Sequence, residues 1–168
     1  MVCMATGAGR AAEPVLPEPV RAKAELKNAQ GEAVGKATLE EMPGGIRLHV
    51  EVSKLPPGMH ACHIHSASAC EPPDFKSAGP HFNPHGKKHG IQSPEGAHAG
   101  DLPNLYVGPP GTGLLDCLVG NVTLVGSGAT SLFHEGGTSL VIHASPDDNV
   151  TDPAGNAGDR IACGAITR

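Results

Sequence analysis

Histidines with the spacing of metal ligands stand close together in the stretch GMHACHIHS, residues 58–66. His63 and His65 are two positions apart, so on a β-strand both imidazoles project from the same face. Such a pair of nitrogen donors suits a borderline metal ion such as copper or zinc. His60 differs from His63 in strand parity and is expected to point to the other face, which favours a structural role for it.

A second group of potential ligands follows in residues 66–101, a long segment rich in proline, glycine and histidine. His81, His89, His98 and Asp101 offer three imidazoles and a carboxylate, a donor set that suits tetrahedral zinc. Bound zinc would also explain how so long a segment becomes ordered in a compact domain. His143 ends the apolar run SLVIH, where it can return to the pair at 63 and 65. The alternative is a solvated loop with incidental histidines, but the coherent spacing favours metal binding.

Alternating apolar and polar residues predict the strands that must position these side chains. Every second residue is apolar in VRAKAELK, residues 20–27, and in IRLHVEV, residues 46–52. This alternation is typical of half-buried antiparallel strands. The PGG at 43–45 lies between these two runs and predicts a hairpin turn. Further strands are expected in GLLDCLVGNVTLVG, TSLVIHAS and DRIACGAIT, which begin at residues 113, 138 and 159.

The composition is that of one all-β domain. The 168 residues include 23 glycines and 16 prolines, which favour many turns over long helices. We expect a flexible N-terminal tail, residues 1–19, and a domain over residues 20–168. The domain is predicted to be a Greek-key β-barrel or sandwich of about eight antiparallel strands with a long metal-binding loop. A net charge of −5 with scattered basic residues argues against a nucleic-acid partner, and no apolar stretch is long enough to span a bilayer.

The five cysteines, at positions 3, 62, 70, 117 and 163, are too few and too scattered for a disulfide scaffold. No CxxC pair is present, which excludes a zinc ribbon. One widely spaced bridge stays open at this point. Cys62 is expected to face inward as a small core residue, and a bridge between Cys62 and Cys117 across the core is an alternative.

Five segments, taken in order, resemble the successive signatures of the copper/zinc superoxide dismutase family: GMHACHIH, SAGPHFNPHGKKHG, GAHAGDLPNL, LVIHA and GNAGDRIACG. The similarity extends from about residue 20 to the C-terminus, and CEPPDFKSAGPHFNP is most similar to bacterial members. The resemblance implies an oxidoreductase that converts superoxide to dioxygen and hydrogen peroxide while copper cycles between Cu(II) and Cu(I). It implies copper on His63, His65, His81 and His143, and zinc on His81, His89, His98 and Asp101.

The same resemblance implies roles for further residues. His81 would bridge the two metals as an imidazolate and carry a proton to the departing peroxide. Asp147 would link a copper histidine to a zinc histidine, and Arg160 would attract and orient the superoxide anion. Cys70 and Cys163 would form the disulfide of the family, which favours an exported protein in an oxidising compartment.

Other features of the resemblance stay open. Family members are monomers or homodimers, and a copper chaperone is a further expected partner. A copper/zinc-binding or storage protein with little dismutase activity is the alternative function, and loss of a copper ligand would be its signature. The segment from Asp147 to Gly155 lacks the charged run of many members. We therefore expect weak electrostatic steering, with Lys87 and Lys88 as its candidate sources.

Overall fold

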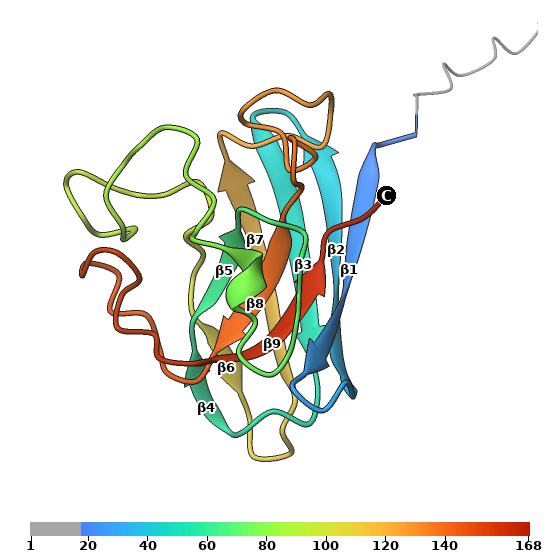
Figure 1. The fold of residues 1–168 in the computed structure, drawn as a ribbon, viewed down its shortest axis with the longest axis vertical. Coiled ribbons are helices and arrows are strands. Elements are labelled where there is room, and N and C mark those ends of the chain that lie inside the picture. The colour runs from blue at the N-terminus through green and yellow to red at the C-terminus, as the bar shows by residue number, and fades with distance from the viewer. Residues whose placement is uncertain (1–17) are drawn as a thin grey trace, which may run out of the picture.

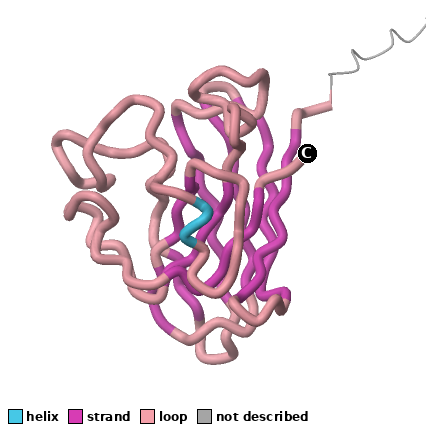
Figure 2. Tube along the Cα trace, viewed as in Figure 1, coloured by secondary structure: helices cyan, strands magenta, loops and turns pink. Residues whose placement is uncertain are grey.

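The structure, a computed structural model, describes residues 18–168. The tail predicted over residues 1–19 and Cys3 therefore lie almost wholly outside the described part. Strands and loops make up nearly all of residues 18–168, with a single turn of 3-10 helix at Lys76–Ala78 (Figure 2). The strands are β1 (Arg21–Asn28), β2 (Ala33–Met42), β3 (Gly45–Val52), β4 (Gly58–His60), β5 (Cys62–His65), β6 (Leu105–Val107), β7 (Gly113–Gly120), β8 (Ser139–His143) and β9 (Arg160–Ala165). The predicted all-β class is confirmed.

One antiparallel sheet contains all nine strands in the order β4-β6-β7-β3-β2-β1-β9-β8-β5. Its two outermost strands, β4 and β5, are consecutive in the chain and are separated only by Ala61. Ala61 donates its N–H to Ser145 O (2.9 Å) and accepts one from His143 N (2.9 Å), so pairing continues across the gap. One interrupted strand therefore closes the sheet into a barrel, which is why nine strands stand where about eight were predicted.

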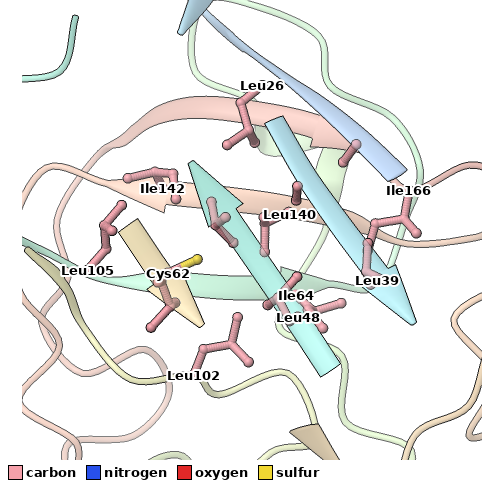
Figure 3. Packing of buried hydrophobic residues seen from close by; sticks show 14 of the residues in the cluster. Leu26, Leu39, Leu48, Cys62, Ile64, Leu102, Leu105, Leu140, Ile142 and Ile166 are labelled. Atoms are coloured by element: carbon pink, nitrogen blue, oxygen red, sulfur yellow. The ribbon is translucent and has the colours of Figure 1, made fainter. Parts of the chain in front are cut away.

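The interior of the barrel follows the predicted alternation. The inward residues of β1 and β3 are buried, from Ala22 and Leu26 to Ile46 and Val52, while their neighbours are exposed or half-buried. Cys62 is buried with the apolar side chains shown in Figure 3. Burial raises the pKa of its thiol above the usual range, and both Cys62 and Cys117 are free thiols. Cys62 is therefore a core residue, and the alternative Cys62–Cys117 bridge is absent from the structure.

Three local predictions need correction. Strand β2 lies between the two predicted runs, and a shift in its register opposite Leu26 and Lys27 breaks the period-two pattern that would have revealed it. The predicted strand from residue 113 ends at Gly120, because Asn121 takes a left-handed conformation (φ 60°) and the chain turns away. Val20 precedes β1 and is 40% exposed, so it does not share the buried face of that strand.

Two long loops lie together on one side of the barrel, coloured green (residues 66–104) and red (residues 144–159) in Figure 1. They are joined by hydrogen bonds, since Gln92 N donates to the backbone Asn149 O (3.1 Å) and His89 N donates to the side-chain Asp152 Oδ1 (2.8 Å). The predicted Cys70–Cys163 disulfide is present and ties the first loop to β9. In residues 18–168, no helix has the length and apolar character needed to cross a membrane.

Candidate metal centre

The first group of histidines gathers where β5, the end of β8 and the long loop meet. His63 and His65 come from β5 and His143 ends β8, while His81 is brought alongside by a bridge to His65. All four side chains are buried, and one ring nitrogen of each lies within 4.8 Å of the others. The four residues predicted as copper ligands are thus assembled as one group, called here the copper set.

Hydrogen bonds on the outer side of these rings decide which nitrogens face inward. His65 Nδ1 contacts Gly79 O (2.9 Å) and His143 Nδ1 contacts Gly158 O (3.2 Å), so each ring uses its single N–H there. Nε2 of His65 then lies 3.4 Å from Nε2 of His143 with no proton between them. His63 Nδ1 and His81 Nε2 are buried without a hydrogen-bond partner. Buried polar atoms left without a partner are costly. A metal cation placed among these four ring nitrogens would give each of them a partner. The copper set therefore has the chemistry of a metal site.

The second group, the zinc set, surrounds one carboxylate oxygen. Oδ1 of Asp101 lies 2.9 Å from His81 Nδ1, 3.0 Å from His89 Nδ1 and 3.3 Å from His98 Nδ1. Ligand atoms at the corners of a tetrahedral zinc site stand about 3.3 Å apart, given metal–ligand bonds of about 2.0 Å. Oδ2 of Asp101 accepts the backbone N–H groups of Gly90 (2.8 Å) and His98 (2.9 Å), which fixes the carboxylate. The donor chemistry and the spacing both fit zinc.

Burial keeps three imidazoles of the copper set neutral. It lowers the pKa of His65 to about 2, that of His143 to about 3 and that of His81 to about 4. Neutral imidazoles present lone pairs, which metal binding requires. His81 is shared by the two groups, with Nε2 in the copper set and Nδ1 in the zinc set.

The carboxylate of Asp147 connects the copper set to the zinc set through hydrogen bonds to one histidine of each. Its Oδ2 accepts from His63 Nε2 (2.7 Å) and its Oδ1 accepts from His89 Nε2 (3.0 Å). Burial raises the pKa of this carboxyl, but the two histidine hydrogen bonds outweigh that effect and hold the pKa at about 2. Asp147 is therefore an acceptor that orients both rings, as carboxylates behind metal-binding histidines commonly do.

A ring of three backbone hydrogen bonds holds the strand and the loop in register. Ile64 N donates to Gly100 O (2.9 Å), Gly100 N donates to Phe82 O (2.9 Å), and Phe82 N donates to Ile64 O (2.8 Å). Each of these residues is a sequence neighbour of predicted ligands. A Cβ on Gly100 would overlap the Ile64 carbonyl, so this close approach requires glycine.

Arg160 starts β9 opposite His143 and is held by two carbonyl groups of the long loop. Its Nη1 donates to Phe75 O (2.7 Å) and its Nη2 donates to Gly79 O (2.8 Å), the carbonyl that also receives His65 Nδ1. Burial lowers the pKa of Arg160. The guanidinium is thus fixed beside the copper set by the loop that the disulfide anchors.

Several residues that support the site were not predicted to do so. Asn104 binds the backbone of Asp147 on both its N–H and its carbonyl (2.8 and 2.9 Å), although DLPN gives no signal for it beyond the resemblance. Asp148 is exposed, and its carboxylate accepts from the backbone N–H groups of Val150 and Thr151 and so organises the turn. His60 contacts His143 O and Pro56 O at 2.8 Å each, which agrees with a structural role. Lys88, predicted to aid steering, lies 3.5 Å from Asp152.

The fold and the site together define a class: a closed antiparallel β-barrel whose strands and long loop bring together two adjoining groups of potential metal ligands that share one histidine. The family model for copper/zinc superoxide dismutase matches residues 33–166. The "Superoxide dismutase [Cu-Zn] 2" of Aquifex aeolicus is 52% identical over 150 residues, 89% of this chain and 88% of the relative. This chain belongs to the copper/zinc superoxide dismutase family.

Solved structures agree with that assignment. A superoxide dismutase-like protein from Bacillus subtilis superposes with a TM-score of 0.81 at 39% identity, covering 85% of this chain and 96% of that one. The copper/zinc superoxide dismutase of Brucella abortus gives a TM-score of 0.70 at 28% identity, covering 87% of this chain and 99% of that one. The predicted family and fold are therefore confirmed.

Proposed function

We propose that this protein is a superoxide dismutase that converts two superoxide ions and two protons into dioxygen and hydrogen peroxide. The observation that carries the proposal is the pair of buried donor groups joined at His81, with unpartnered nitrogens facing inward in the copper set. A storage protein would be indicated by a missing copper ligand, and all four positions are histidines here. Family membership supports the enzyme over the storage alternative.

In this proposal His63, His65, His81 and His143 hold copper, and His81, His89, His98 and Asp101 hold zinc. Bound copper supplies the one-electron couple that oxidises one superoxide and reduces the next, and zinc, which has no redox chemistry, orders the loop. His81 can exchange a proton at Nε2, because no group within residues 18–168 forms a hydrogen bond with this nitrogen. Its position between the two sets would let it deliver that proton to a departing peroxide.

Arg160 is proposed to bind and orient the anion. The two carbonyl groups that it contacts restrict its guanidinium to one position, so little conformational entropy remains to be lost when an anion binds. The net charge of −5 repels superoxide at long range, which makes a fixed local cation more important. Because Lys88 is paired with Asp152, its attraction for superoxide would be weakened, and Arg160 would supply the fixed cation beside the copper set.

We also propose that the protein is exported. A disulfide between Cys70 and Cys163 persists in oxidising compartments and is rare in reducing ones. Membership of the copper/zinc superoxide dismutase family, with bacterial relatives such as that of Aquifex aeolicus, supports the same location.

The test is to measure bound copper and zinc and then superoxide dismutation after metal loading. One equivalent of each metal with dismutation supports the proposal, whereas full loading without activity overturns it and favours storage. The variant His81→Ala is expected to weaken binding of both metals. His85→Ala is the matched control, since His85 is an exposed histidine of the same loop outside both sets, and it should leave metal content unchanged.

A further inference from the structure

We infer that Gly155 and Asn104 are positioning residues that lock Asp147 against both metal groups, so that zinc binding depends on a bare Cα at position 155. This inference rests on the proposed function, because it takes the zinc set to bind zinc. Neither residue belongs to the copper set or the zinc set, and neither has a role toward superoxide in the proposed function.

Gly155 lies directly over the hydrogen bond between Asp147 and His89. A Cβ built on Gly155 would overlap Oδ1 of Asp147 and would stand 2.5 Å from its Cγ and 2.7 Å from Nε2 of His89. Side-chain atoms essentially never approach so closely, so any larger residue must displace the carboxylate or the imidazole. The missing side chain thus leaves the space that the Asp147–His89 contact occupies.

The position of Gly155 is itself fixed, so the backbone has little freedom to relieve such an overlap. Its N–H donates to Thr151 O (2.7 Å) and its carbonyl accepts from Asp148 N (2.9 Å). The turn between these residues is further held by Asp148, whose carboxylate accepts from Thr151 N (2.8 Å) and Asn156 Nδ2 (2.9 Å). Gly155 also has a left-handed backbone (φ 62°), a second reason for glycine there.

Asn104 fixes Asp147 from the other side. Its Oδ1 accepts from Asp147 N (2.8 Å) and its Nδ2 donates to Asp147 O (2.9 Å), so the amide pairs with this residue as a neighbouring strand would. Asn104 directly precedes β6 and therefore ties the 144–159 loop to the barrel. Asn104 and Gly155 together restrict the Asp147 carboxylate to one position. In that position it accepts hydrogen bonds from both His63 and His89.

Held in this way, Asp147 transmits the orientation of His89 in the zinc set to His63 in the copper set. Displacement of the carboxylate frees both imidazoles to rotate or to change tautomer. Losing the partner that orients a metal-binding histidine typically costs about 10–100-fold in metal affinity. We therefore expect Gly155→Ala to weaken zinc binding at least tenfold, and Asn104→Ala to weaken it to a similar or smaller extent.

The experiment measures the affinity of the metal-free full-length protein for Zn²⁺ by competition with a chelator. Gly126→Ala is the matched control, because Gly126 also has a left-handed backbone (φ 70°) but its Cβ would meet nothing within 4 Å. The control should bind zinc within about twofold of the original protein. Circular dichroism and thermal unfolding of the metal-free variants establish that each one folds.

A double-mutant cycle separates positioning from general destabilisation. In the Asp147→Ala background the carboxylate is gone, so Asn104→Ala should change zinc affinity by less than about twofold. Gly155→Ala should cost less there than in the original protein, although not nothing, because its Cβ still stands 2.7 Å from Nε2 of His89. Equal zinc affinity of Gly155→Ala and the original protein would overturn the inference. So would a loss matched by Gly126→Ala, or a loss that persists in full without Asp147. Failure of the original protein to bind zinc would instead refute the proposed function.

Discussion

Removing the disulfide should destabilise this protein strongly and should also disturb the site. The bond joins Cys70 to Cys163, 93 residues apart, and so closes a loop that covers more than half of the chain. In the chain-entropy description, a closed loop of this length stabilises the folded state by about 4–5 kcal/mol. At about 2–4 °C per kcal/mol for a protein of this size, the double variant Cys70→Ser, Cys163→Ser should unfold about 8–20 °C lower.

The effect on the site follows from where the bond attaches. Cys70 begins the segment whose carbonyl groups at Phe75 and Gly79 hold Arg160. Without the bond this segment can move away from β9, so the guanidinium loses its fixed position beside the copper set. We expect kcat/KM for superoxide to fall in the double variant even where copper and zinc are fully loaded.

The assay is thermal unfolding of the metal-free proteins followed by circular dichroism, with and without a reductant. The reductant should bring the midpoint of the original protein down to that of the double variant and leave the double variant unchanged. The free thiols of Cys62 and Cys117 are common to both proteins and cannot account for a difference. Midpoints that agree within about 3 °C would refute the loop-closure reasoning.

Three other outcomes follow from the site. Arg160→Lys should lower kcat/KM by about tenfold at unchanged metal content, because a lysine ammonium cannot contact both carbonyl groups as the two Nη atoms of the guanidinium do. Unchanged kinetics would contradict the proposed role of Arg160. The metal-free protein should lose stability as the pH falls below about 6.5. In the folded state the pKa values of His65, His81 and His143 lie well below that of the unfolded chain, which therefore takes up protons first; urea unfolding that is flat between about pH 7 and pH 5 would contradict this. Finally, kcat/KM should fall by less than about threefold between about 10 and 200 mM salt, because Lys88 is paired with Asp152, and a steep fall would show steering that the structure does not explain.

The grouping of the candidate ligands could be predicted because its geometry is local or carried by ordered motifs. Strand parity alone places His63 and His65 on one face, and the structure has both rings in one group. Parity also separated His60 and Cys62 from that pair correctly. The resemblance supplied what parity could not, above all the Cys70–Cys163 pairing, which spans most of the domain.

What the sequence did not reveal depends on contacts between distant segments. Strand β2 was missed because a register shift interrupts its alternation, and no local pattern encodes that shift. The contacts of Asn104 with Asp147 and the position of Gly155 over His89 exist only after two loops have packed together. An asparagine or a glycine in a loop is common, so its type alone does not predict such a role.

The strand that closes the barrel has a consequence for the order in which the two metal groups form. β5 carries two residues of the copper set but pairs with β8, so this group requires contacts between residues 63 and 143. The zinc set lies within residues 81–101, and short loops close at a lower entropic cost than long ones. Strands β1, β2 and β3 are neighbours in sequence and can pair as local hairpins before the distant strands β5 and β8 have met. We expect the side chains of the zinc group to gather first during folding, and both groups to be completed only when the barrel closes and Asp147 reaches His63 and His89.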